Sequence, residues 1–263
     1  MKIGRYTIKS GTIKLRSRKV IRPSVVKVRF PSVDRDLDYY NDRFRLHQGD
    51  FVFVDGKLEG KRGTVVAVTY DFNIDPARYK RVISVADPSV RGRFESIGNY
   101  MLTFDRHALP YESFRSWVMP GTAEDQHYIN FNDTGVDLKN ISTWGIDPAA
   151  FARGVDYYEQ NRVLYISVDR GCGRAIVSGT KPYELRFTLK DNTVTGLSCG
   201  CPCFSGCKHE AALLLELRDL VDEFLSAKYR SRWDDTGYFA AVSPISLISM
   251  AGCGGRTAVL DIR

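Results

Sequence analysis

Four cysteines and one histidine crowded into eleven residues constrain this chain more than any other feature. The stretch "SCGCPCFSGCKH" runs from Ser198 to His209 and leads directly into an apolar helical pattern. A structural zinc ion is held by four thiolate or imidazole ligands in a closed tetrahedron. The first cysteines end a predicted strand and the last ligands begin a predicted helix. The spacing therefore predicts one structural Zn²⁺ held by Cys199, Cys201, Cys207 and His209.

The ligand set has one alternative, because Cys203 has the same strand parity as Cys199 and Cys201. Either Cys199 or Cys203 completes the predicted site. Other chemistries fit less well. A disulfide between C-x-C cysteines is strained. A four-cysteine iron–sulfur cluster gives His209 no role, and the cysteine spacing matches no standard iron–sulfur motif. A catalytic thiol requires one exposed, activated cysteine.

The order Cys199-Gly-Cys201-Pro, followed by Cys207-Lys-His209, resembles the C-x-C…C-x-H signature of SWIM zinc fingers. Upstream, "FARGVDYYEQNRV" and "AIVSGTKPYELRFTL" are similar to the region that precedes the finger in bacterial members. The resemblance covers residues 147–227 and assigns Cys199 to the site. Two departures are the five-residue gap after Cys201 and the additional thiol of Cys203. The resemblance implies a small module that recognises DNA or protein, here without an ATPase domain.

Around this motif we expect a SWIM domain over residues 146–228. Asp147-Pro148 predicts a capped helix start, and residues 163–169, 174–178, 183–189 and 193–197 read as strands. Apolar residues at helical spacing predict an amphipathic helix from His209 to about Leu225. Residues 229–263 form a C-terminal extension, in which we expect a final strand or an extended tail.

The N-terminal part, residues 1–94, predicts a small barrel-like β unit. Short β-branched and aromatic runs are separated there by Gly, Pro and Asp. Residues 49–68, "GDFVFVDGKLEGKRGTVVAV", resemble a KOW-type strand–loop–strand, in which the loop often contacts RNA or a protein. The alternative is an ordinary solvated hairpin. Residues 95–145 are expected to be a linker or an irregular cap, so the predicted fold class is a multi-module α+β protein.

Basic residues concentrate at the front of the chain. Residues 1–30 hold ten Lys or Arg and no acidic residue, a pattern that favours nucleic-acid phosphates, although a solvated strand face has the same composition. The predicted nucleic-acid contacts are Lys14, Arg16, Arg18, Lys19, Lys57, Lys61 and Arg62. The alternative function is an adaptor that docks onto a nucleic-acid-processing machine.

The remaining sequence features narrow the class of protein. Phosphate-loop, metalloprotease and hydrolase motifs are missing, so we expect no enzyme. The acidic run from Asp34 to Asp38 lacks the glycine of a calcium loop. Neither a secretory signal nor a membrane-spanning apolar run is readable. We therefore expect a cytoplasmic protein in a reducing compartment, with no membrane partner.

Overall fold

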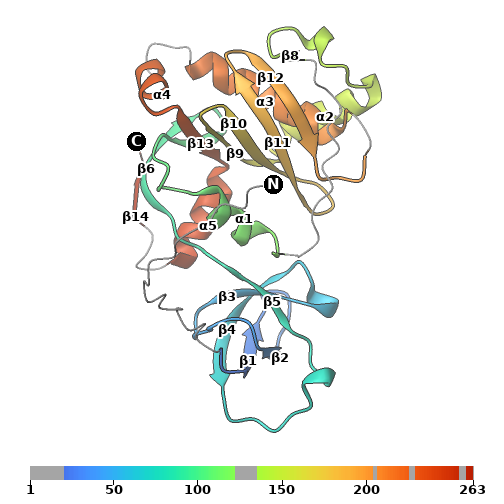
Figure 1. The fold of residues 1–263 in the computed structure, drawn as a ribbon, viewed down its shortest axis with the longest axis vertical. Helices are drawn as coiled ribbons and strands as arrows, with labels where there is room; N and C mark the ends of the chain where they lie inside the picture. The colour runs from blue at the N-terminus through green and yellow to red at the C-terminus, as the bar shows by residue number, and fades with distance from the viewer. Residues whose placement is uncertain (1–20, 122–134, 204–205, 225–228, 255–258, 263) are drawn as a thin grey trace, which may run out of the picture.

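The computed structural model describes residues 21–121, 135–203, 206–224, 229–254 and 259–262 of the 263-residue chain. These residues form two β-sheets and five α-helices (Figure 1). The smaller sheet has the order β2-β1-β4-β3-β5 and is antiparallel throughout. Its strands are β1 Ser24–Arg29, β2 Leu37–Asn41, β3 Phe51–Val54, β4 Arg62–Thr69 and β5 Val82–Ala86.

Alternation along β1 explains how the small sheet forms its core. Val26 and Val28 are buried, whereas Lys27 and Arg29 on the opposite side are exposed. The buried valines join Phe30, Val52 and Val65 in one hydrophobic cluster. The exposed basic residues pair with carboxylates instead, Lys27 with Asp38 and Arg29 with Asp36.

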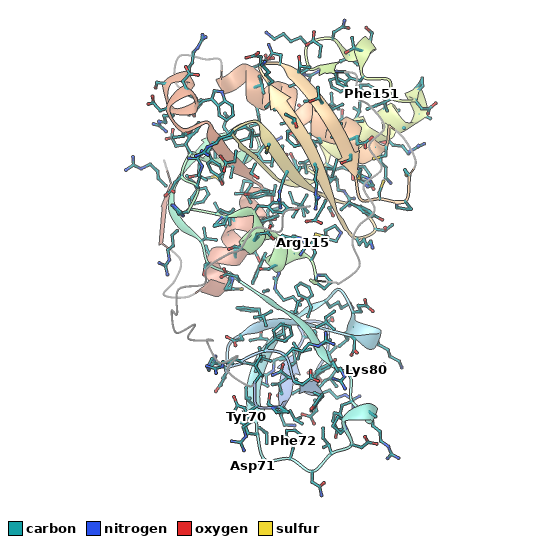
Figure 2. All side chains as sticks on the ribbon, viewed as in Figure 1. Tyr70, Asp71, Phe72, Lys80, Arg115 and Phe151 are labelled. Carbon is teal, nitrogen blue, oxygen red and sulfur yellow. The ribbon has the colours of Figure 1, made fainter. Side chains whose placement is uncertain are left out.

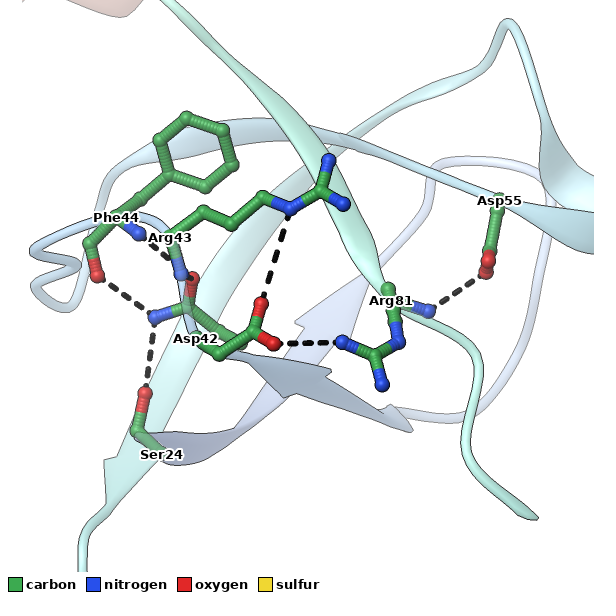
Figure 3. A network of polar contacts seen from close by, with 7 residues as sticks. Ser24, Asp42, Arg43, Phe44, Asp55 and Arg81 are labelled. Atoms are coloured by element: carbon green, nitrogen blue, oxygen red, sulfur yellow. Dashed lines mark hydrogen bonds and ion pairs between the residues drawn. The ribbon is translucent and has the colours of Figure 1, made fainter. Parts of the chain in front are cut away.

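The small sheet is open, which corrects the expectation of a barrel. Within the described residues, β2 and β5 are joined by a single isolated bridge between Tyr40 and Arg81. Polar side chains fasten this junction (Figure 3): the Arg81 guanidinium contacts Asp42 at 2.6 Å, and the Arg81 backbone N–H donates to Asp55 at 2.6 Å. The side-chain amide of Asn41, at the end of β2, donates to the Ser24 hydroxyl of β1 next to this junction. Side-chain contacts therefore take the place of a continuous strand pairing.

The larger sheet has nine strands in the order β14-β6-β7-β13-β9-β10-β11-β12-β8. All its pairings are antiparallel except β14 with β6, which is parallel. Its strands are β6 Arg91–Ile97, β7 Tyr100–Thr103, β8 Val136–Asp137, β9 Val163–Asp169, β10 Cys172–Ser178, β11 Pro182–Lys190, β12 Thr193–Cys199, β13 Tyr238–Val242 and β14 Val259–Ile262.

Helices cover both faces of the large sheet (Figure 1). On one face, α2 Pro148–Glu159 and α3 Lys208–Phe224 pack over the cluster that contains Ala175 and Leu185. On the other, α1 Tyr111–Val118 and α5 Pro244–Gly254 pack over Tyr165 and Ile176. The short helix α4, Arg230–Thr236, precedes β13. None of the helices in the described part of the chain is long and apolar enough to cross a membrane.

Two expected peripheral segments are integral to the large sheet. Residues 95–145, expected to be a linker or cap, contribute the last three residues of β6, all of β7 and β8, and helix α1. Residues 229–263, expected to be an extension, contribute β13, which lies between β7 and β9. All five residues of β13 are buried. A strand buried on both faces has no polar–apolar alternation, which is why the pattern does not single it out.

Candidate metal centre

The predicted ligands come from two elements that meet at one end of the large sheet. β12 pairs antiparallel with β11 and ends at Cys199, and Cys201 lies two residues beyond it. On the other side, Cys207 directly precedes α3, and His209 lies in the first turn of that helix. The structure brings these four side chains together, and all four are buried.

The distances in the cluster match a tetrahedral zinc site. The four ligand atoms lie within 4.8 Å of one another. His209 Nδ1 is 3.8 Å from Cys199 Sγ and 3.7 Å from Cys207 Sγ. Zinc–ligand bonds of about 2.3 Å to sulfur and about 2.05 Å to nitrogen give a sulfur–nitrogen edge of roughly 3.6 Å in a tetrahedron. The two sulfur–nitrogen edges that involve His209 are therefore close to those of a zinc site, and the donor set suits this ion.

Cys203 is placed differently from the other three cysteines of the motif. Its side chain is exposed, and it is not a member of the four-residue cluster. Of the two ligand sets left open by the sequence, the structure assembles the set that contains Cys199. This geometry also disfavours the four-cysteine iron–sulfur arrangement, since His209 occupies the fourth corner.

Helix α3 is held at its start by a contact that was not predicted from the sequence. The backbone N–H of Cys207 donates to Glu210 Oε2 at 2.9 Å, and the backbone N–H of Ala211 donates to the Cys207 carbonyl at 3.0 Å. The first contact is the carboxylate half of a capping box, with the acidic residue three positions after the cap. The spacing of Cys207 and Glu210 is the sequence signal for it. The carboxylate fixes the turn that carries Cys207 and His209.

The thiols influence one another strongly. The pKa of Cys199 is raised by its hydrogen bond to Cys201 and by burial. The pKa of Cys201 is lowered because the thiols of Cys199 and Cys207 stabilise its thiolate. The cluster thus contains one favoured thiolate surrounded by donors. A metal cation would replace the remaining protons, because the thiolate is the form of cysteine that binds metals.

Aromatic rings enclose the imidazole of His209. The ring centroid of Tyr183 lies 4.8 Å from that of His209, and the centroid of Tyr157 lies at 5.5 Å. Nδ1 faces the sulfurs, while the buried Nε2 has no hydrogen-bond partner within the described residues. Metal binding at Nδ1 places the imidazole proton on Nε2, next to these rings. A neutral, metal-binding histidine is therefore compatible with these apolar surroundings.

Close packing between α2 and α3 sets the position of the ligand-bearing turn. A Cβ atom added to Gly154 of α2 would lie 2.3 Å from Cβ of Ala211 on α3. Glycine therefore lets the two helices approach at the point where α3 begins. Asp147 caps α2, as the sequence predicts, by accepting from the backbone N–H groups of Ala149 and Ala150.

Three of the seven predicted nucleic-acid residues lie within the part of the chain that the structure describes. Lys14, Arg16, Arg18 and Lys19 lie outside the described residues. Lys57 and Lys61 are exposed in the connection between β3 and β4, as expected of a contact loop.

Arg62 has a structural contact instead. Its guanidinium lies 3.1 Å from the ring centroid of Trp117 on α1 and donates to the Trp117 carbonyl. Burial lowers the pKa of Arg62 to about 10. This side chain joins the small sheet to α1, and its role as a nucleic-acid contact stays a prediction.

No protein-family model, curated protein or solved structure matches this chain in comparisons with known proteins. The resemblance to SWIM fingers is therefore supported by the motif and its geometry alone. The class that the fold and the site define is a protein of mixed helices and mainly antiparallel sheets, with a buried Cys₃His cluster able to hold a metal ion.

Proposed function

We propose that this protein is a zinc-stabilised recognition module of the SWIM type, with one structural Zn²⁺ bound by Cys199, Cys201, Cys207 and His209. The observation that supports this proposal is the convergence of four buried ligand atoms within 4.8 Å of one another. The ion would fasten the end of β12 to the start of α3. Structural zinc contributes on the order of 10 kcal/mol of apparent binding free energy to a small module. We propose no catalytic role for the three cysteine ligands, because a reactive thiol requires exposure and their side chains are buried.

Zinc content and chelation test the structural role. We expect one zinc per chain by elemental analysis of protein purified under reducing conditions. Cys201→Ser should lose the ion, whereas the matched control Cys203→Ser should retain it. Chelation should expose residues 195–225 to proteolysis and leave residues 24–86 protected. If the metal-free protein keeps the same far-UV signal and proteolytic pattern, the ion has no structural role.

We propose nucleic acid as the partner, bound through the basic N-terminal segment. Residues 1–20 hold seven Lys or Arg and no acidic residue, which equals the +7 net charge of the whole chain. The remainder is therefore neutral. Of the other basic residues among the first thirty, Arg22, Lys27 and Arg29 each pair with an aspartate. The exposed Lys57 and Lys61 add charge in the KOW-like connection.

A salt titration of binding to a random duplex and to a single strand tests this proposal. Deletion of residues 1–20 removes the charge while leaving β1, the inner strand that pairs with β2 and β4. We expect a steep loss of affinity with salt for the full chain and loss of binding on deletion. Lys57→Gln with Lys61→Gln should reduce the salt slope by up to about 2. Absence of binding at low salt would contradict the proposal.

A protein-binding adaptor is the second candidate function. Ile245 and Ile248 on α5 are 84% and 62% exposed, although both side chains are large and apolar. Residues 145–230, which include the cluster, carry eleven basic and eleven acidic residues, so this part has no net charge to attract phosphates. Failure of nucleic-acid binding together with a folded, zinc-loaded protein would favour the adaptor. Both functions place the protein in a reducing, intracellular compartment.

A further inference from the structure

A cavity of about 510 Å³ opens on the large sheet beside the turn between β9 and β10. Its volume is in the range of small-molecule sites. Ser167 and Tyr238 come from the strands. Arg106 follows β7, while Arg170 and Arg174 both belong to the β9–β10 hairpin.

The cavity is independent of the metal centre. Ser167 and Arg174, which line the cavity, have the same strand parity as Tyr165 and Ile176. Tyr165 and Ile176 belong to the cluster covered by α1 and α5, so the cavity lies on that face of the large sheet. The Cys₃His cluster joins the core on the α3 side. His209 of this cluster lies beside Gly179, beyond the end of β10 opposite Cys172.

Two of the three arginines are held in place by carboxylates and tyrosine rings. Arg106 donates to Asp169 Oδ1 at 2.9 Å and to the Thr236 carbonyl at 2.6 Å, and its guanidinium lies 5.3 Å from the Tyr238 ring centroid. Arg174 donates to Glu112 Oε1 at 3.0 Å. These contacts fix the two guanidinium groups before any ligand arrives.

The tyrosine that faces Arg174 is itself anchored. The Arg174 guanidinium lies 4.8 Å from the ring centroid of Tyr111. Tyr111 donates its hydroxyl proton to Glu184, and Arg115 donates to the same carboxylate at 2.6 Å. Arg115, labelled in Figure 2, lies on α1 at the side of the large sheet that faces the small one. The wall of the cavity formed by α1 is thus tied to β11.

Arg170 is the third arginine and differs from the other two. It forms a two-residue turn with Gly171, and both residues have positive φ, 49° and 84°. Such type I′ turns favour asparagine at the first position. The two other non-glycine residues with positive φ in the described part of the chain are Asn161 and Asp191, which tolerate this region. An arginine there costs about 1 kcal/mol of backbone strain.

The guanidinium of Arg170 has neither a hydrogen-bond nor an ion-pair partner within the described residues, whereas Arg106 and Arg174 have carboxylate partners. The cavity therefore holds three positive and two negative charges, an excess of one. Arg170 is exposed and lines the cavity, so its charge has no compensating carboxylate in the part of the chain that the structure describes and is available to a ligand.

We propose that this cavity binds a small phosphorylated molecule, with Arg170 as the main contact to its phosphate. One guanidinium fork satisfies the two coplanar oxygens of a carboxylate. Three guanidinium groups, one after β7 and two from the β9–β10 hairpin, suit the tetrahedrally arranged oxygens of a phosphate instead. The cavity is larger than a phosphate ion requires, so the ligand carries an organic body that lies against Pro110, Cys172 and Tyr238.

Isothermal titration with ribose 5-phosphate, ribose and gluconate tests the proposal on the full chain. We expect saturable binding of ribose 5-phosphate, at least 10-fold weaker binding of gluconate, and none of ribose. Arg170→Asn should weaken the binding of ribose 5-phosphate by 10-fold or more, the effect of a lost charge-assisted hydrogen bond. Because asparagine suits the turn, this variant should unfold at the same or a higher temperature. The control Arg153→Gln, at an exposed position on α2, should bind as the wild type does.

Three results would overturn the proposal. One is binding of ribose 5-phosphate by Arg170→Asn within twofold of the wild type. Another is binding of gluconate as tight as that of ribose 5-phosphate, which would indicate a carboxylate site. The third is tighter binding of a 5′-phosphorylated decanucleotide that is lost in Arg170→Asn, which would assign the cavity to nucleic-acid ends.

Discussion

Glu216 provides a quantitative test of the packing between α3 and the large sheet. Its side chain is 4% exposed, and its Oε1 atom has no hydrogen-bond partner within the described residues. Burial and the nearby charge of Asp219 raise the pKa of Glu216 from 4.5 to about 7, and a hydrogen bond from Tyr100 opposes the rise. In the folded protein this carboxyl group is therefore protonated over much of the range in which the unfolded chain ionises it.

The sign and size of the effect follow from proton linkage. The folded state binds the Glu216 proton more tightly, so this contribution to stability is full below pH 4.5 and is lost as the pH rises through about 7. The complete loss is about 3 kcal/mol at 1.36 kcal/mol per pKa unit. Between pH 5.5 and 8.5 the loss amounts to about 2 kcal/mol.

Urea unfolding of Glu216→Gln and of the wild type, both saturated with zinc, measures this loss. The glutamine variant cannot ionise, so its free energy of unfolding should rise relative to the wild type by about 2 kcal/mol from pH 5.5 to pH 8.5. Metal-linked changes cancel in the difference, because Glu216 lies about 10 Å along the helix from His209. Asp222→Asn, at an exposed position on the same helix, is the control and should show no such trend. Parallel curves for Glu216→Gln and the wild type would refute the reasoning.

Three further predictions concern the packing between elements. Gly154→Ala should displace α3 by contact with Ala211 and lower the free energy of unfolding by about 1–3 kcal/mol. The variant should then lose its zinc at a lower concentration of a competing chelator than the wild type does. Unchanged zinc affinity would contradict this. Arg62→Ala should lower the free energy of unfolding in urea by about 1–2 kcal/mol, because it loses the contacts with Trp117, and should leave nucleic-acid affinity unaltered. Unchanged stability with weaker nucleic-acid binding would instead support Arg62 as a nucleic-acid contact. Asn41→Ala leaves buried polar groups unpaired and should lower the free energy of unfolding by about 2–3 kcal/mol. Amide hydrogen exchange should then increase in the small sheet before it increases elsewhere. An equal increase in all elements would count against this prediction.

The candidate metal centre is predictable from the sequence because its ligands are close along the chain. Cys199 and Cys201 leave one strand end, Cys207 and His209 enter one helix, and a short connection joins the two pairs. Local spacing therefore determines which atoms can meet. The choice between Cys199 and Cys203 needed three dimensions, because both have the same strand parity and differ in whether they face the helix.

Long-range neighbours account for what the sequence could not predict. β13 pairs with β7, more than 130 residues earlier, and its residues have no alternation that would reveal two buried faces. The basic pattern around Arg62 gave no indication that Trp117, 55 residues later, would contact its guanidinium. Similarly, Arg106, Arg170 and Arg174 are unremarkable in the sequence, and only the pairing of β9, β10 and β13 brings them around one cavity.

The central position of β13 also has a consequence for synthesis. Until Tyr238–Val242 leave the ribosome, β6 and β7 have no strand to join them to β9, because β13 supplies both neighbours. During translation the nascent chain would hold two separate sheet fragments with unpaired edges, and such edges are prone to aggregation. We expect ribosome-bound chains halted before Tyr238 to recruit chaperones and to be cleaved readily by protease, and chains halted well beyond α5 to resist cleavage.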